Sequence, residues 1–425
     1  MKKMAIVSSY NELCGNATYT EVLRKEFSKY YKVDVLALRS DLLGSTKSNI
    51  VRLGDKHIKN IAIKLKEYDY VNIQFEAGLY GVTRGDIFRR IKMLINSCDN
   101  LIFTMHRVDI PESLLDKQYL KKLMSGNWIG NIKTFRQNSY MAHLYYMIIC
   151  YLKKISNKKN INVIVHTKRE KKNIQQIFKF NRVFDFPITF LDENMRQRER
   201  SEQERKIFLE KYGLQEDDVI IGLFGFISEY KGHETAIKSL KFLPENYKIM
   251  IFGSQHPMSI MSNTPIDGYI HRLVKLIEEN SYELNFSSKV NFDKIESLQK
   301  RSFDKRVFFA GSLNDEDFID ALYCCDFAVL PYMETNQSGS GIASLVLESK
   351  IKSLFSNNKA FFELQKYYPN CFESFDIGNY NELAYKLLNY KSDYTTKLNK
   401  CLEKYNLETN VLFQKNILEG NVKDE

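Results

Sequence analysis

Two short stretches in the second half of the chain combine small residues with charged or hydroxyl groups. Residues 225–232, GFISEYKG, end an apolar run at Gly225 and place Lys231 where a helix is expected to begin. The free N–H groups and partial positive charge of a helix start attract anions, and a lysine adds a full charge. We therefore expect Lys231 to help bind a diphosphate, with an ordinary surface lysine as the alternative.

The second stretch, ETNQSGSGIAS (334–344), follows another apolar run and leads into a predicted helix. Glycines let backbone amides approach a ligand closely, because no Cβ intervenes. Ser338 or Ser340 can cap the helix. Glu334 and Gln337 add polar contacts that a plain turn would not need. We expect a ligand-binding loop here, and a capped turn between strand and helix is the alternative.

Three more residues with suitable chemistry stand at predicted strand ends in the first half. Glu76 ends VNIQFE, His106 ends LIFTMH, and His166 lies at the end of INVIVHT. Ligands of open α/β sheets bind at the carboxyl ends of the strands, so these side chains should face one crevice. A single strand-end histidine is more often structural, but three such residues favour a site. No HExxH motif, GxSxG motif or cluster at metal-ligand spacing is present.

For these residues to stand at strand ends, the chain must contain two successive series of alternating strands and helices. Strands are predicted at residues 4–10, 32–38, 68–76, 100–106 and 161–167, and again at 218–227, 247–253, 305–311 and 326–332. Apolar strands separated by helical segments favour parallel sheets covered on both faces. The polar segment 191–205 has almost nothing to bury, which indicates a linker or an exposed helix. The stretch 257–304 resembles an insertion.

Composition narrows the classes of function. The 425 residues suggest two or three domains, and the net charge of +10 favours anionic partners. Seven scattered cysteines without a CxxC pair indicate neither a zinc site nor a disulfide framework, which fits a cytoplasmic location. The apolar run 141–152 is too short to span a bilayer. With its basic surroundings (131–173) it is either a core helix or a patch that docks on an anionic membrane.

Several motifs together resemble one enzyme family. GFISEYKGHETAIKSL, IMIFG, RVFFAGSLNDEDFIDALYCCDFAVLPY and ETNQSGSGIAS resemble the C-terminal half of GT-B glycosyltransferases of retaining family 4, which act in bacterial surface polysaccharide assembly. CGNATYTEVL, VNIQFEAGLYG and FTMHRVD are similar to the N-terminal half. The resemblance covers roughly residues 1–400. It implies two Rossmann-like doubly wound domains that face a central cleft.

The resemblance also implies domain bounds and roles. We expect an acceptor-side domain at 1–190, a nucleotide-sugar-binding domain at 191–400, and a helical tail at 401–425 that returns to the first domain. The donor would be a nucleotide sugar and the acceptor a glycan or a lipid-linked glycan, with no cofactor, metal or nucleic acid. The catalytic candidates are His106, Lys231 and Glu334, and the acceptor-side candidates are Glu76 and His166. Donor-binding residues are Gly15, Asn16, Gly225, Phe226, Lys231, Gly253, Ser338, Gly339, Ser340 and Gly341.

Two positions depart from the family pattern. Phe226 stands where many members carry an arginine, so the diphosphate would lose one positive partner. The family's pair of glutamates separated by seven residues is missing, which leaves Glu334 as a substitute for the first and Glu348 as a residue of the helix surface. The alternatives to a glycosyltransferase at the inner membrane face are a nucleotide-sugar epimerase of the same fold and a non-catalytic binding scaffold.

Overall fold

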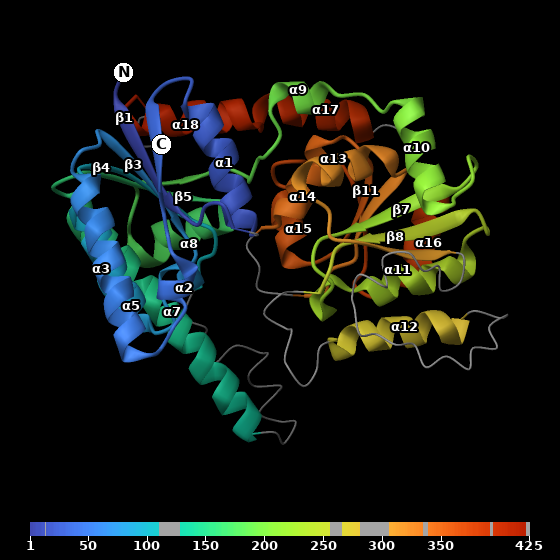
Figure 1. The fold of residues 1–425 in the computed structure, drawn as a ribbon, viewed down its shortest axis with the longest axis horizontal. Helices are drawn as coiled ribbons and strands as arrows, with labels where there is room; N and C mark the ends of the chain where they lie inside the picture. Colours follow the sequence, from blue (N-terminus) through green and yellow to red (C-terminus); the bar gives the residue numbers. More distant parts are fainter. Residues whose placement is uncertain are drawn as a thin grey trace. The chain divides into compact units, whose positions relative to one another are not determined.

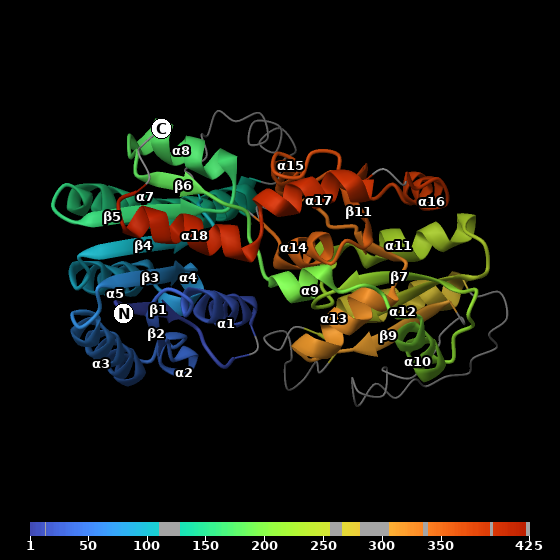
Figure 2. The ribbon, with the colours of Figure 1, turned by 90° about the horizontal axis from the view of Figure 1, so that it is seen from above.

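The computed structural model of the protein describes residues 1–12, 14–109, 128–255, 266–280, 306–334, 339–391 and 394–421. These form two compact units, each built around its own sheet (Figures 1 and 2). Unit 1 comprises Met1–Ile188 together with Leu407–Glu425, and unit 2 comprises Thr189–Asn406. The chain therefore returns to unit 1 after completing unit 2.

Unit 1 contains a six-stranded parallel sheet in the order β2-β1-β3-β4-β5-β6. The five strands predicted for this half are confirmed, with ends shifted by a few residues. The sequence pattern missed β6, a strand of only three residues beyond β5. The bounds are β1 Lys3–Ser8, β2 Lys32–Ala37, β3 Tyr70–Phe75, β4 Asn100–Met105, β5 Asn160–Val165 and β6 Val183–Asp185.

Helices cover both faces of this sheet, which is the doubly wound arrangement expected from the sequence. On one face, α3, α5, α7 and α8 pack over an apolar core. On the other, α1 and α18 contact each other and the sheet. The bounds are α1 Gly15–Phe27, α2 Ser40–Leu43, α3 Ser48–Leu65, α4 Ala77–Tyr80, α5 Arg84–Asn96, α7 Trp128–Ser156, α8 Lys168–Phe178 and α18 Leu407–Leu418.

Unit 2 repeats the architecture with a parallel sheet in the order β12-β11-β10-β7-β8-β9. Its four predicted strands are confirmed, whereas β11 and β12 were not predicted. The bounds are β7 Val219–Phe224, β8 Tyr247–Phe252, β9 Val307–Gly311, β10 Phe327–Leu330, β11 Lys352–Ser356 and β12 Glu373–Phe375.

Two apolar clusters lie on the two faces of the second sheet. Helices α11, α12 and α16 contribute to one cluster, and α10, α13, α14, α15 and α17 contribute to the other. Helix α12 falls inside the stretch 257–304, so part of that stretch belongs to the core. The bounds are α9 Glu193–Gln197, α10 Glu202–Tyr212, α11 His233–Ser239, α12 Gly268–Asn280, α13 Asp315–Cys324, α14 Gly341–Glu348, α15 Lys359–Leu364, α16 Tyr380–Leu388 and α17 Tyr394–Lys404.

The polar segment 191–205 differs in detail from its sequence interpretation. The segment 191–205 does bury side chains, because Leu191 is 2% exposed and Arg205 is 8% exposed. Arg205 donates to the backbone of Cys324 and forms an ion pair with Asp326 at 3.0 Å, an attachment that a count of apolar residues cannot reveal.

The apolar run 141–152 lies in α7, where five of its side chains are buried in the core of unit 1: Leu144, Tyr145, Ile148, Ile149 and Leu152. Among the helices that the structure describes, none is long and apolar enough to cross a membrane.

Candidate functional site

In unit 2, two glycines bring neighbouring strand ends into close contact. Gly225 follows β7 with a φ of +97°, and Gly253 follows β8. A Cβ at Gly253 would lie 2.0 Å from the carbonyl oxygen of Gly225, so no larger residue fits there. A Cβ at Gly225 would lie 3.2 Å from Nζ of Lys231 and 3.5 Å from the side chain of Ile342. Predicted residues from two loops, together with Ile342 of α14, therefore meet at one edge of the sheet.

Lys231 is buried at the centre of this group. It ends a short 3₁₀ helix (Glu229–Lys231) and is 6% exposed. The next residue, Gly232, has a φ of +65°, and a Cβ there would lie 2.0 Å from the carbonyl oxygen of Pro331. This close approach holds the lysine against the loop after β10.

The amine of Lys231 has aromatic and hydroxyl neighbours. Its Nζ makes a short hydrogen bond with the Tyr332 hydroxyl and lies 4.1 Å from the centre of that ring, while the Tyr230 ring is 5.4 Å away. In the part of the chain that the structure describes, no carboxylate lies within ion-pair distance of it. Sequence reasoning did not single out Tyr332, because it is the last residue of the predicted strand 326–332.

Burial controls the charge of these groups. Removal from water lowers the pKa of the Lys231 amine, because the charged form loses its hydration and gains no negative partner. Burial, followed by the nearby Lys231, lowers the pKa of His233 to about 3. Burial also raises the pKa of the Tyr332 phenol. Burial thus disfavours a positive charge on Lys231, and a bound anion would stabilise that charge.

The small-residue loop starts helix α14 next to this lysine. Ser340 is the predicted cap, since its Oγ accepts from the N–H of Ala343 at 3.3 Å. The same Oγ lies 3.5 Å from the Tyr332 hydroxyl. Gly339 is half-buried, and a Cβ at Gly341 would lie 3.1 Å from the Phe190 ring. Ser338 and Gln337 lie outside the described residues.

The two glutamates near this loop behave differently. Glu334 is exposed and accepts from the N–H of Lys359 at 3.3 Å, at the start of α15. Glu348 was interpreted as a helix-surface residue, and this is wrong, because its exposed fraction is 0%. Its carboxylate accepts from the N–H groups of Phe190 at 2.9 Å and Leu191 at 3.2 Å. Glu348 therefore fastens the start of unit 2 to α14. Phe226 is half-buried directly after Gly225.

In unit 1, the structure brings His106 and His166 into direct contact. Nδ1 of His106 and Nε2 of His166 are 3.2 Å apart. The other nitrogen of His106 lies 2.8 Å from Oε1 of Gln74, and the other nitrogen of His166 lies 3.1 Å from the carbonyl oxygen of Phe186. The Tyr19 ring meets the His106 ring edge-on, with centroids 5.6 Å apart. All four ring nitrogens therefore face protein partners.

These three contacts need three N–H protons, because an acceptor oxygen stands at each end of the pair. Two neutral imidazoles carry only two. Burial lowers the pKa of His166 to about 4 and that of His106 well below its usual value. One added proton shared by the rings would complete all three contacts, whereas a second would set two N–H groups against each other. The pair is therefore built to take up at most one proton.

The histidine pair continues into a row of buried amides that reaches α18. Gln74 donates to Asn72 at 2.5 Å, and Asn72 donates to Gln414 at 2.8 Å. Gln414 donates to Asn410 at 2.9 Å, and Asn410 donates to the Tyr19 hydroxyl at 3.3 Å. The four amide side chains are at most 1% exposed. This amide row connects α18, which lies in the second segment of unit 1 (Leu407–Glu425), to strand β3.

The remaining predicted residues of unit 1 lie around the same sheet. Glu76 precedes α4, is half-buried, and has a raised pKa because of burial. Gly15 is exposed at the first position of α1, and Asn16 is half-buried beside it. They begin the helix that carries Tyr19 one turn later. Gln74 and the amide row were not predicted, because amides inside a strand give no motif.

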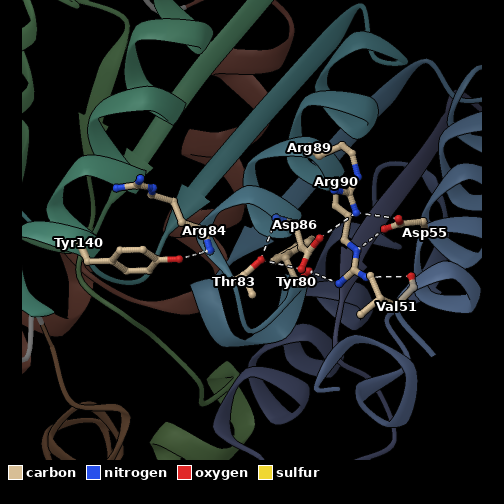
Figure 3. Close-up of polar contacts among 9 residues, drawn as sticks. All are labelled: Val51, Asp55, Tyr80, Thr83, Arg84, Asp86, Arg89, Arg90 and Tyr140. Atoms are coloured by element: carbon tan, nitrogen blue, oxygen red, sulfur yellow. Dashed lines mark hydrogen bonds and ion pairs between the residues drawn. The ribbon is translucent and has the colours of Figure 1, made fainter. Parts of the chain in front are cut away.

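A buried arginine, Arg90, connects the helices on the other face of the sheet, and Figure 3 shows its contacts with Val51, Asp55 and Tyr80. Arg90 is 1% exposed and donates to Asp55 at 2.8 Å, to the Tyr80 carbonyl at 2.9 Å and to the Val51 carbonyl at 3.2 Å. The Tyr80 hydroxyl in turn donates to the carbonyl of Gln74 at 2.9 Å. Arg90 of α5 thereby joins α3 and α4, and Tyr80 connects them to Gln74, the residue whose side chain contacts His106.

The two groups differ in what they can do chemically. In unit 2, an amine, a phenol and the start of α14 converge where an anion would be stabilised. In unit 1, the two histidines and the amide row hydrogen-bond with one another and with the Phe186 carbonyl, so they act as a buried support for the strand ends.

Comparison with solved structures shows the fold. HepE of Anabaena, solved in complex with UDP, superimposes with a TM-score of 0.62 at 11% identity, covering 99% of this chain and 100% of that one. Sucrose-phosphate synthase from Thermosynechococcus elongatus gives 0.65 at 12% identity, covering 99% of each chain. WaaG, a glycosyltransferase involved in lipopolysaccharide biosynthesis, gives 0.55 at 12% identity, covering 98% of this chain and 100% of that one.

No protein-family model matches the sequence, and a search of curated proteins found no match. At these identities the likeness concerns the fold and not the reaction. The two Rossmann-like α/β units, each with a six-stranded parallel sheet, therefore give this chain the GT-B fold.

Proposed function

We propose that the protein is a retaining glycosyltransferase that moves a sugar from a nucleotide-sugar donor to a glycan or lipid-linked acceptor. The pathway would be surface polysaccharide or glycoconjugate biosynthesis. The observation that carries this proposal is Lys231, which is 6% exposed and has no carboxylate partner in the described part of the chain. A buried amine with hydroxyl neighbours at a helix start is suited to a diphosphate. The complex of HepE with UDP supports the same assignment.

In the proposed reaction, the diphosphate leaves as the bond at the anomeric carbon breaks. Lys231, the Tyr332 hydroxyl and the amides at the start of α14 would stabilise its growing negative charge. This set supplies charge stabilisation without a metal, so we include metal independence in the proposal. His106 would orient the sugar, and Glu334 is proposed as a further contact. Glu76 and His166 would lie on the acceptor side.

Nucleotide binding tests the donor site directly. Thermal unfolding with UDP, ADP and GDP should show a rise in melting temperature for the preferred nucleotide, and Lys231→Met should abolish the rise. Lys241→Met, at an exposed position, is the matched control and should retain it. If no nucleoside diphosphate or nucleotide sugar changes the melting temperature, the proposal is refuted.

Product analysis tests the reaction. Incubation with the preferred nucleotide sugar and a membrane extract should release nucleoside diphosphate and label a glycan, in the presence or absence of EDTA. Nuclear magnetic resonance of the product should show the anomeric configuration of the donor. Conversion of the nucleotide sugar into its epimer without an acceptor would instead indicate an epimerase.

We extend the proposal to peripheral attachment at an anionic membrane. Lys154 is exposed in the last turn of α7, Lys158 is exposed just after that helix, and Lys168 and Lys172 are exposed on α8. Each lysine near an anionic surface contributes about 1 kcal/mol at low salt. Sedimentation with vesicles should show binding to phosphatidylglycerol but not to phosphatidylcholine, with loss at high salt. Binding that survives replacement of all four lysines by glutamine would contradict this attachment.

A further inference from the structure

Two cysteines that are far apart in the sequence touch in unit 2. Cys371 lies two residues before β12 and is 1% exposed, and Cys401 is half-buried in α17. The S–H of Cys371 donates to Sγ of Cys401 at 3.5 Å. All seven cysteines lie in the described part of the chain, and this is the pair joined by a sulfur–sulfur hydrogen bond. Unit 2 therefore holds a dithiol whose sulfur atoms are already in contact.

We propose that Cys371 and Cys401 form a reversible disulfide when the protein meets hydrogen peroxide. The bond would tie α17 to the segment that leads into β12. The two sulfur atoms of a disulfide are about 2.05 Å apart, so these two must move about 1.5 Å closer. A turn of the half-buried Cys401 side chain can supply most of this movement. The proposal is independent of the donor site proposed above.

A tight turn holds Cys371 against α17. Asn370 has a φ of +55°, a left-handed conformation that asparagine adopts more readily than most residues. The N–H of Cys371 donates to the carbonyl oxygen of Tyr368 at 3.3 Å, which closes the turn. The Tyr368 hydroxyl donates to the carbonyl oxygen of Tyr405 at 3.3 Å, just after α17. Both cysteines thus belong to one packed region of unit 2, and joining them needs no large rearrangement.

The surroundings indicate which sulfur reacts first. Burial raises the pKa of the Cys371 thiol, and its hydrogen bond to Cys401 adds to this effect, so Cys371 keeps its proton. Cys401 is the more exposed of the two, and Lys397 and Lys404 lie one turn before and one turn after it on α17. Positive neighbours and partial exposure are typical of cysteines that oxidants attack. Cys401 is therefore the sulfur that meets the oxidant, and Cys371 is the one that closes the bond.

The reaction balances with one molecule of peroxide. The Cys401 sulfur attacks the peroxide and becomes a sulfenic acid, and a first water leaves. The Cys371 sulfur then attacks the Cys401 sulfur, and the displaced hydroxide leaves as a second water with the Cys371 proton. In total the two thiols give up two electrons and two protons, and both oxygen atoms of the peroxide are reduced to water.

The bond would stabilise the last helix of unit 2. The two cysteines are 30 residues apart, and the loop that they close contains β12, α16 and most of α17. A disulfide across such a loop restricts the unfolded chain, which stabilises the folded state. On oxidation we expect the melting temperature of unit 2 to rise by about 5 to 10 °C and the amides of α17 to exchange at least about tenfold more slowly. Dithiothreitol should reverse both changes.

Peptide mapping can detect the bond directly. The folded protein is treated with hydrogen peroxide, its remaining thiols are blocked with N-ethylmaleimide, and it is digested with trypsin. We expect a cross-linked product of peptides 367–386 and 401–404, with two hydrogen atoms fewer than the separate peptides, which dithiothreitol splits. Cys401→Ser should give no cross-link. Cys150→Ser, at a half-buried cysteine of α7, is the matched control and should retain it.

Three results would overturn the proposal or its consequence. The first is peroxide treatment that oxidises the folded protein, at Cys401 or elsewhere, without producing the cross-link. The second is a cross-link that appears only after the protein has been unfolded in urea. The third is an unchanged melting temperature and unchanged exchange of α17 after complete cross-linking, which would overturn the stabilising role of the bond.

Discussion

Replacement of Gln414 by leucine tests the amide row that joins α18 to the histidine pair. The substitution removes the acceptor of the Asn72 side-chain N–H and the donor to the side-chain oxygen Oδ1 of Asn410. All three residues are no more than 1% exposed. A buried polar group left without a partner costs about 1 to 3 kcal/mol. Two such groups give about 2 to 6 kcal/mol, and the gain from burying leucine offsets part of it. We expect unit 1 to lose about 3 kcal/mol of unfolding free energy.

Hydrogen exchange followed by mass spectrometry can assign this loss to one unit. Peptides that cover β3, β4 and α18 should exchange faster by a factor corresponding to about 3 kcal/mol, on the order of a hundredfold. Peptides from unit 2 should be unchanged. Asn416→Leu, at a half-exposed amide of the same helix, is the matched control and should shift exchange by less than about 0.5 kcal/mol. Unchanged protection of β3 and β4 in Gln414→Leu would refute the reasoning.

Three further predictions follow from the described contacts. Gly253→Ala should destabilise unit 2 by about 1 to 3 kcal/mol and weaken nucleotide binding, because its Cβ would meet the Gly225 carbonyl at 2.0 Å; Gly268→Ala, with no neighbour within 4 Å, should be neutral in chemical denaturation. Because burial lowers the pKa of His166 from 6.5 to about 4 and that of His106 well below its usual value, the unfolded state binds protons more readily. His166 alone should cost unit 1 about 3 kcal/mol as pH falls from 6.5 to 4, and His166→Gln should reduce the pH dependence without abolishing it. Arg90→Met should cost about 2 to 5 kcal/mol, because the Tyr80 and Val51 carbonyl oxygens lose their donor while Asp55 keeps its pair with Arg89. Arg89→Met, 48% exposed, should cost less than about 1 kcal/mol; equal losses would contradict this account.

The sequence predicted the fold class because the strong signals were local. Long apolar strands such as 218–227 stand out in composition, and their alternation with helical segments predicted two parallel sheets. Strands β6 and β12 have only three residues each, too few for a periodic pattern. Their place depends on pairing with β5 and β11, which no local window contains.

The donor-side loops could also be located from sequence, since glycines and a lysine at strand ends form a recognisable pattern. The partner of Lys231 could not be located in this way, because Tyr332 lies in the loop after β10, about a hundred residues further along the chain. Glu348 was misassigned for a similar reason. Its partners are backbone N–H groups at the start of unit 2, and backbone groups carry no sequence signal.

The return of the chain to unit 1 sets an order for folding during synthesis. The β3 amides of unit 1 find their buried partners on α18, which is made only after all of unit 2, roughly 220 residues after the first segment of unit 1 is complete. At typical elongation rates of about 5 to 20 residues per second, this interval is on the order of 10 to 40 seconds. During this interval, the part of the first sheet that α18 will cover stays exposed. The buried amides of β3 can then form incorrect contacts with other parts of the nascent chain. Unit 2, which is continuous in sequence, can complete its core first, although it is made second.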